Sequence, residues 1–127
     1  MFEHGQLPGS LELAFIGDTL WDLMVRTRLV KKGGSMKQLN RSATQHVCAR
    51  AQSEALARIE PLLTEEETDI VKRARNAHQN PTKNADPADY HRATALEALV
   101  GYLYLSGEKE RMEMLMQTAL PEDEEKK

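Results

Sequence analysis

The sequence predicts an all-α protein of a single domain, on three observations. Apolar residues recur at helical spacing in each long stretch, and no stretch alternates as a strand does. Residues typical of helix starts and helix ends stand between these stretches. The chain has 127 residues, enough for one modest hydrophobic core. We expect that core within residues 10–119 of the domain 1–127, followed by an acidic, flexible tail over residues 120–127.

The first helix is expected over residues 10–30, with Ser10 as its N-cap. The apolar residues at helical spacing along it are Leu13, Ile16, Leu20, Leu23 and Met24. Phe15 and Trp21 fall outside this series, so they predict a second, outer apolar face. The cations and glycines of residues 31–34 (KKGG) should end the helix.

A second helical run is expected from its cap, Ser35, to about residue 62. The run is long for a globular protein, so one long helix and a helix broken in its middle both remain open. Cys48 lies in this run and is expected to pack within the helix. As the single cysteine of the chain, it leaves no internal disulfide and fits a reducing cytoplasm.

The remaining helices are expected over residues 65–77, 87–105 and 108–119. Thr64 and Glu67 form a capping box at the start of the first of these. Asp86 or Asp89 caps the second, with Pro87 in its first turn. Met112, Leu115, Met116 and Ala119 of the last helix stand at helical spacing and are expected to face the core.

The net charge of −3 conceals a segregation of charge along the chain. Residues 26–50 and 72–83 contain cations and no Asp or Glu, while acids gather at residues 65–67 and 122–125. A chain with this pattern can present a positive face to a polyanion. No apolar run approaches the roughly 20 residues of a membrane span, and no signal peptide is evident. We therefore expect a cytoplasmic protein without a membrane partner.

Two apolar helices each carry one carboxylate and one glycine. Gly17 and Asp18 interrupt the first helix, and Glu97 and Gly101 interrupt residues 93–105. A carboxylate in such a setting needs a cation or hydrogen-bond donors, and carboxylates are typical Mg²⁺ ligands. The residues alone leave two interpretations open. One is a shared metal site; the other is a solvated Asp18 at a local bend and a Glu97 paired with an arginine.

These two stretches carry a resemblance to a known family. Residues 11–20 (LELAFIGDTL) resemble the ribonuclease III signature E-R-L-E-F-L-G-D-A-V-L, and residues 93–105 (ATALEALVGYLYL) resemble that family's second motif, A-D-x-x-E-A-L-I-G-A-I-Y-L. The resemblance covers residues 10–119 and is greatest to the compact Mini-ribonuclease III group, which lacks a double-stranded-RNA-binding domain. R-A-R-N-A-H from residue 73, K-N-A-D from residue 83 and Y-H-R from residue 90 are similar to that group specifically.

The resemblance implies an all-helical homodimer that cuts double-stranded RNA with Mg²⁺, or with Mn²⁺ in its place, and leaves 5′-phosphate and 3′-hydroxyl ends. Asp18 and Glu97 fall on the family's catalytic, metal-binding carboxylates, and Phe15 falls on an aromatic residue of its dimer interface. The residues expected to contact RNA are Arg73, Arg75, Asn76, Lys83 and Asn84. The expected substrate is the precursor of large-subunit ribosomal RNA, and a ribosomal protein is a candidate further partner.

The chain departs from the family pattern at further carboxylates. Leu11 and Ala14 replace the glutamates of the signature, and Thr94 replaces the aspartate of the second motif. The compact group shares these replacements. We expect Ala14 and Thr94 to border the metal site, because they lie one turn before Asp18 and Glu97. Asp22 lies one turn after Asp18 and is either a neighbour of the site or a solvated surface acid.

The reduced set of carboxylates also favours an alternative function. The chain would then be a non-catalytic RNA-binding or scaffold dimer that kept the fold and lost cleavage. Against this alternative stands the presence of both Asp18 and Glu97, because a protein that only binds RNA has no need of inward-facing carboxylates.

Overall fold

The structure is a computed structural model that describes residues 6–77 and 86–120. Its helices are α1 (Ser10–Lys32), α2 (Met36–Val47), α3 (Ala49–Ile59), α4 (Glu65–Arg75), α5 (Pro87–Leu105) and α6 (Lys109–Ala119), with a 3-10 turn, η1 (Glu60–Leu62), after α3. The all-α prediction is confirmed, because every regular element in the described residues is a helix. Within those residues, none of the helices is both long enough and apolar enough to cross a membrane.

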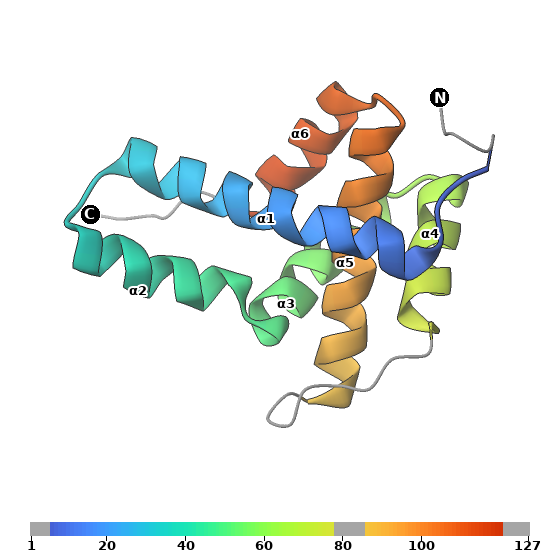
Figure 1. The fold of residues 1–127 in the computed structure, drawn as a ribbon, viewed down its shortest axis with the longest axis horizontal. Coiled ribbons are helices and arrows are strands. Elements are labelled where there is room, and N and C mark those ends of the chain that lie inside the picture. The colour runs from blue at the N-terminus through green and yellow to red at the C-terminus, as the bar shows by residue number, and fades with distance from the viewer. Residues whose placement is uncertain (1–5, 78–85, 121–127) are drawn as a thin grey trace.

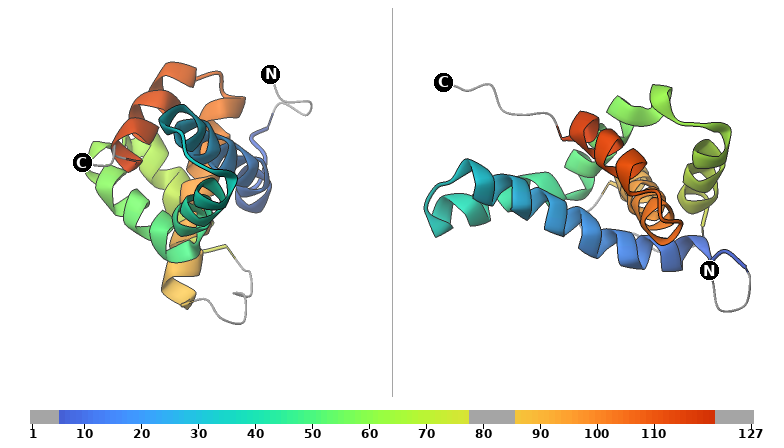
Figure 2. Two further views of the ribbon diagram at one scale, coloured as in Figure 1. Left: turned by 90° about the vertical axis from the view of Figure 1, so that its left-hand side faces the viewer. Right: turned by 90° about the horizontal axis from the view of Figure 1, so that it is seen from above.

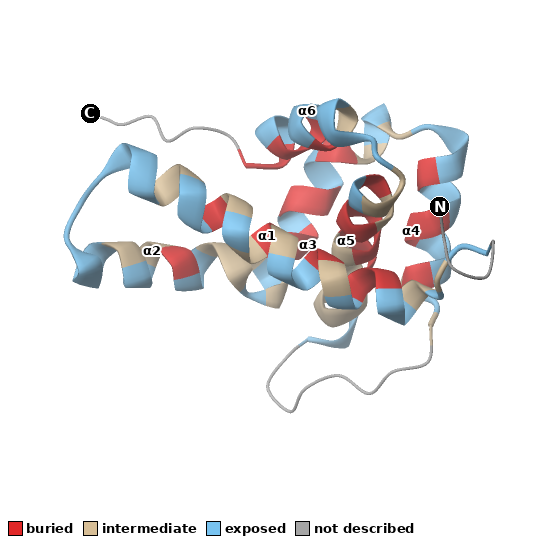
Figure 3. Ribbon diagram, turned by 45° about the horizontal axis from the view of Figure 1, so that its top comes forward, coloured by how far each residue is buried: buried red, intermediate tan, exposed pale blue. Residues whose placement is uncertain are grey.

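Helix α5 is the centre of the fold (Figure 1). Its residues are apolar on nearly all sides, as in a helix that other helices surround. Helix α1 crosses α5, and α3 and α4 also pack against it. Buried residues accordingly run along α5, while the outer faces of the other helices are exposed (Figure 3). The C-terminal half of α1 extends beyond this core and pairs with α2 in an arm (Figure 2).

Helices α1 and α5 approach each other so closely that only glycine fits where they cross. A Cβ atom on Gly17 would overlap the carbonyl group of Glu97, and a Cβ atom on Gly101 would overlap the carbonyl oxygen of Leu13. Each helix thus presents a glycine to the backbone of the other. The sequence places both glycines inside apolar helices, where they lower helix propensity. The close approach that they permit explains why they are there.

The start of α1 differs from the prediction by one residue. Gly9, not Ser10, is the N-cap, and Ser10 is the first residue of the helix. The side chain of Glu12 closes the turn, because its Oε1 accepts a hydrogen bond from the backbone N–H of Gly9 at 2.8 Å. The helix continues to Lys32 and ends at Gly33, whose φ of 95° favours glycine.

The second helical run is broken, which was one of the two alternatives that the sequence left open. Cys48 has an extended backbone between α2 and α3 and is exposed, so the prediction that it packs within a helix is wrong. In an unbroken helix the His46 carbonyl would accept a bond from the backbone of Arg50. Here it accepts one from the Trp21 indole Nε1 at 3.1 Å. Trp21 is 1% exposed, so its prediction as part of an outer apolar face is also wrong.

The predicted caps of the later helices are confirmed. Thr64 and Glu67 form the capping box of α4, and Asp86 caps α5. Glu67 has a second role, because its carboxylate is buried and accepts two hydrogen bonds from Arg111 of α6. The Arg111 guanidinium holds the pKa of Glu67 below its ordinary value. This ion pair joins the last helix to the start of α4. The methionines Met112 and Met116 of α6 are buried, as predicted.

We expect Gly101→Ala to destabilise the fold, because the added Cβ atom would overlap the Leu13 carbonyl oxygen. In an open helix the same change stabilises by about 1 kcal/mol. Overpacking at this crossing should instead lower the free energy of unfolding by roughly 1–3 kcal/mol. Equilibrium urea denaturation measures the difference. Gly9→Ala is the control, since its Cβ atom would make ordinary contact with Glu12; it should lose less than about 1 kcal/mol. A Gly101→Ala variant as stable as the parent would contradict the close crossing.

Candidate active site

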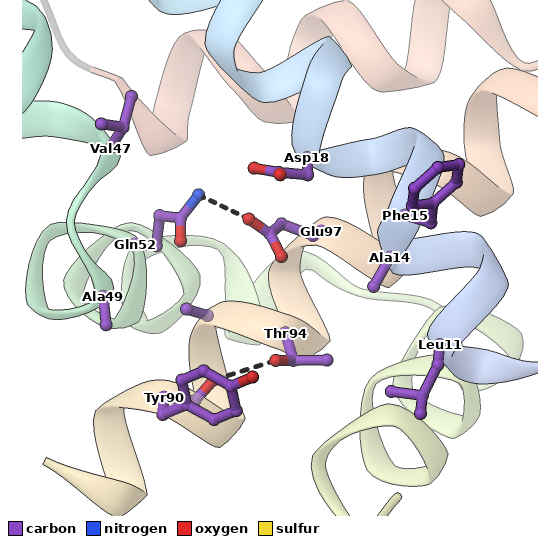
Figure 4. Close-up of a pocket in the computed structure, with 11 residues that line it drawn as sticks. Leu11, Ala14, Phe15, Asp18, Val47, Ala49, Gln52, Tyr90, Thr94 and Glu97 are labelled. Atoms are coloured by element: carbon purple, nitrogen blue, oxygen red, sulfur yellow. Dashed lines mark hydrogen bonds between the residues drawn. The ribbon is translucent and has the colours of Figure 1, made fainter. Parts of the chain in front are cut away.

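The glycine crossing brings two carboxylates together. Asp18 follows Gly17 on α1, and Glu97 lies one turn before Gly101 on α5. Because the two backbones touch at the glycines, the side chains of Asp18 and Glu97 lie side by side and point into the same pocket (Figure 4). Asp18 is exposed, whereas Glu97 is partly buried. The structure thus brings together the two carboxylates that the sequence singled out.

Both carboxylates open into a pocket of about 430 Å³ between α1, α5 and the junction of α2 and α3. Its walls are formed by Leu11, Ala14, Phe15, Asp18, Val47, Ala49, Gln52, Tyr90, Ala93, Thr94 and Glu97. Ala14 and Thr94 therefore border the carboxylate pair, as expected from their helical positions. Neither can supply a carboxylate oxygen. The Thr94 hydroxyl donates a hydrogen bond to the Tyr90 carbonyl at 3.1 Å (Figure 4).

Glu97 has a strongly perturbed acidity. Burial raises the pKa of its carboxyl group from the ordinary 4.5 to about 8, and hydrogen bonding with Asp18 and the Asp18 charge act in the same direction. A hydrogen bond from Gln52 lowers the pKa and opposes these effects in part. In the absence of a cation, Glu97 thus holds a proton near neutral pH. The pair is a place where positive charge, from a proton or a metal ion, relieves repulsion between two acids.

Gln52 is a site residue that sequence reasoning missed. It lies in the first turn of α3 and is 3% exposed. Its Nε2 donates a hydrogen bond to Oε2 of Glu97 at 3.2 Å (Figure 4). The only sequence signal was a polar residue on the inner side of an alanine-rich helix. That signal does not say which helix the glutamine meets, 45 residues further along the chain.

The donor set of this pocket fits a magnesium ion. Asp18 and Glu97 offer hard carboxylate oxygens, and Mg²⁺ is bound by one or two carboxylates with water and substrate phosphates. Among residues 6–77 and 86–120, no group of three or more His, Cys, Asp or Glu side chains could hold a metal. A site made wholly from protein ligands is thus not formed by these residues. A site that shares its ion with a phosphate is compatible with them.

Three of the predicted RNA-contacting residues, Arg73, Arg75 and Asn76, lie at the end of α4. Arg73 is exposed and forms an ion pair with Asp69 at 3.1 Å. Arg75 is partly buried, and Asn76 follows as the C-cap of the helix. Lys83 and Asn84 lie outside the described residues. An exposed ion pair between neighbouring turns holds a cation weakly, so the pairing of Arg73 leaves it available to a phosphate.

Asp22, whose role the sequence left open, is part of a surface ion pair. Its carboxylate accepts a hydrogen bond from Nε of Arg26 at 3.0 Å, and both side chains are substantially exposed. It is not among the residues that line the pocket. Phe15, the predicted interface residue, is 83% exposed at the edge of the pocket.

Fold and site together define an all-helical domain with paired carboxylates in an open pocket. Residues 11–108 match the Ribonuclease III domain family. The chain is 47% identical to a Mini-ribonuclease 3 of Brevibacillus brevis, over 89% of this chain and 86% of the relative. It is also 47% identical to a Mini-ribonuclease 3 of Symbiobacterium thermophilum, over 86% and 85%. The crystal structure of a Fusobacterium nucleatum protein superposes with a TM-score of 0.83 at 32% identity, over 90% of this chain and 94% of that one.

The chain belongs to the ribonuclease III family, and within it to the compact Mini-ribonuclease III group. It is an endoribonuclease of that family. The resemblance seen in residues 11–20 and 93–105 is thereby confirmed.

We expect the stability of the metal-free protein to fall as pH rises from about 4.5 to about 8. The pKa of Glu97 is raised from 4.5 to about 8 on folding. Such a group contributes stability that is fully present below the lower value and lost as pH passes the upper one. Glu97→Gln cannot ionise, so it should lose less stability over this range. Urea denaturation across it, in the presence of a chelator, compares the two proteins. Parallel stability curves would show that the Glu97 environment does not raise its pKa.

Proposed function

We propose that this endoribonuclease cleaves double-stranded RNA by metal-dependent hydrolysis, with Asp18 and Glu97 as its catalytic residues and Mg²⁺ ligands. The observation that carries the proposal is the convergence of these two carboxylates in an open pocket. Glu97 is held in a position where its ionised form needs a cation beside it. Mn²⁺ should be able to replace Mg²⁺, because both accept hard oxygen ligands.

The residues of the pocket would have different roles in such a reaction. Asp18 is exposed and reaches toward the open side, where a phosphodiester can approach. Glu97 stands deeper and is anchored by Gln52. A bound Mg²⁺ would supply charge neutralisation and an attacking water of lowered pKa. Ala14 and Thr94 leave room beside the pair, so the phosphate oxygens themselves can complete the coordination.

We further propose that the products carry 5′-phosphate and 3′-hydroxyl ends and that the substrate is the precursor of large-subunit ribosomal RNA in the cytoplasm. The support is membership of the Mini-ribonuclease III group. Incubation with long double-stranded RNA, with and without Mg²⁺, tests cleavage, and ligation of the products to adaptors specific for each end tests the termini. A ribosomal protein as a further partner can be tested by adding RNA already bound to ribosomal proteins.

A non-catalytic RNA-binding dimer is the competing function. The observation in its favour is that Ala14 and Thr94 stand in the pocket where further carboxylates would strengthen a metal site. The same incubation separates the two functions, because a pure binder would retain the RNA without cutting it whether or not Mg²⁺ is present.

Asp18→Asn and Glu97→Gln should each reduce cleavage to background while fold and RNA binding remain. Each change keeps the shape of the side chain and removes the negative charge that would hold the cation. Asp22→Asn is the matched control, since Asp22 pairs with Arg26 outside the pocket; it should cleave normally. Turnover assays with excess RNA, together with circular dichroism and filter binding, measure the three properties. Near-normal turnover of either pocket variant would remove that residue from the proposed site.

Charge reversal of Arg73 and Arg75 should weaken RNA binding and make it less sensitive to salt. Each phosphate contact contributes to the salt dependence, so losing one contact should reduce the slope of log affinity against log salt by about one. Lys109→Glu is the control, because Lys109 follows the end of α5 that lies away from the pocket. If the double variant keeps the parental slope, RNA crosses another face of the protein.

We propose that the protein is a homodimer with Phe15 in the interface. The side chain is 83% exposed, and Leu11 on the same helix face is 40% exposed. Phe15→Asp should therefore shift the protein from dimer to monomer in sedimentation equilibrium. Val30→Asp is the control, since Val30 is a similarly exposed apolar residue near the other end of α1; it should leave the dimer intact. A parent protein that sediments as a fully active monomer would refute the proposal.

A further inference from the structure

Gln52 contacts the acidic pair from a helix that carries neither carboxylate. It is nearly fully buried, and its amide Nε2 lies 3.2 Å from Oε2 of Glu97. Figure 4 shows the amide and the Glu97 carboxylate pointing toward each other in the pocket. We infer that Gln52 is a positioning residue, which holds the Glu97 carboxylate toward Asp18 so that both acids can converge on one cation. The inference rests on the proposed function of these two carboxylates.

Glu97 requires such a support for an electrostatic reason. Its side chain has three rotatable bonds, and the pocket into which it points is open. Two carboxylates that lie side by side repel each other when both are ionised, so an unsupported Glu97 that had lost its proton would turn toward solvent. A hydrogen bond to one oxygen restrains the carboxylate and leaves its second oxygen free of Gln52. The restraint matters once Glu97 has lost its proton, because that is the form of the carboxylate that binds a cation.

The chemistry of an amide suits this role better than a cation would. A lysine or arginine at position 52 would also hold Glu97, but it would neutralise the carboxylate and repel a divalent ion. The neutral amide donates its N–H and leaves the negative charge of the pair intact. Hydrogen-bond partners behind metal ligands commonly orient those ligands in this way. A glutamine that served only to stabilise the fold would not need to donate its hydrogen bond to a carboxylate of the site.

Gln52 itself is held in place by the packing of α3 on α5. Arg92 of α5 donates from Nε to the Ser53 hydroxyl at 3.0 Å and from Nη2 to Glu60 Oε1 at 3.0 Å. These bonds join Ser53, near the middle of α3, and Glu60, its C-cap, to the helix that carries Glu97. The break at Cys48 places Gln52 in the first turn of α3, beside the pocket. The packing of α3 thus holds the amide beside the Glu97 carboxylate.

The test uses the intact protein and Mg²⁺ alone as the probe. Gln52→Leu and Gln52→Met keep the approximate size of the side chain but replace its amide with an apolar group, which removes the hydrogen-bond donor. An ion that binds the folded state raises Tm with its concentration, so Tm is measured over a Mg²⁺ titration without RNA. We expect both variants to need roughly 10- to 100-fold more Mg²⁺ for the same rise in Tm. Cleavage should be lost at low Mg²⁺ and recover as Mg²⁺ is raised, while KM for RNA at saturating Mg²⁺ is unchanged.

Ser53→Ala is the matched control. It removes one Arg92 contact and so loosens α3 without touching Glu97. It should lower Tm but leave the response to Mg²⁺ unchanged. The inference is overturned if Ser53→Ala shows the same altered response as the Gln52 variants, or if the Gln52 variants respond as the parent does. A parent that neither responds to Mg²⁺ nor cleaves RNA would instead remove the proposed function, which is a distinguishable result.

Discussion

The contact between the backbones of α1 and α5 is the constraint on which the rest of the structure depends. Gly17 and Gly101 allow each helix to touch the other's carbonyl groups, and no larger residue fits at either place. This contact sets the depth at which α1 lies on the central helix. The same contact places Asp18 opposite Glu97, because each acid is within one turn of its glycine. The same helix crossing therefore determines both the fold and the site, and a larger residue that separated the two helices would change both.

The pairing of Asp18 with Glu97 lowers the stability of the fold when both acids are ionised. Burial and the neighbouring charge raise the pKa of Glu97 to about 8, so its ionisation at higher pH destabilises the metal-free state. The surrounding helix offsets this, since α5 buries apolar residues on both sides of Glu97, among them Leu96 and Leu99. The unfavourable electrostatic energy is confined to this pair of acids. A cation in the pocket would relieve it by taking the place of the proton. Unfavourable pairs of this kind are common at functional sites.

Local sequence signals predicted much of this molecule, and contacts between distant segments account for what they missed. The capping box of Thr64 and Glu67 depends on residues within one turn, so it could be read directly. The burial of Trp21 could not be predicted in this way. Its indole N–H bonds the His46 carbonyl, which is available because the helix breaks at Cys48, and the spacing of apolar residues alone does not locate that break. Gln52 escaped for the same reason, since its role exists only once α3 lies on α5. Asp18 and Glu97 were found because each stands out within its own helix.

The sparse set of acids in the pocket couples the proposed metal site to its substrate. With Ala14 and Thr94 beside the pair, the described part of the pocket offers two carboxylates, so several positions around a Mg²⁺ ion fall to water and phosphate oxygens. If RNA supplies some of those oxygens, RNA tightens the metal, and by linkage the metal tightens RNA to the same extent. Ribonucleases with more acids in the pocket would hold the ion without RNA and show less of this coupling. The restraint that we propose for Gln52 then matters most in the RNA-free state, because there the two carboxylates bind the ion without help from a phosphate.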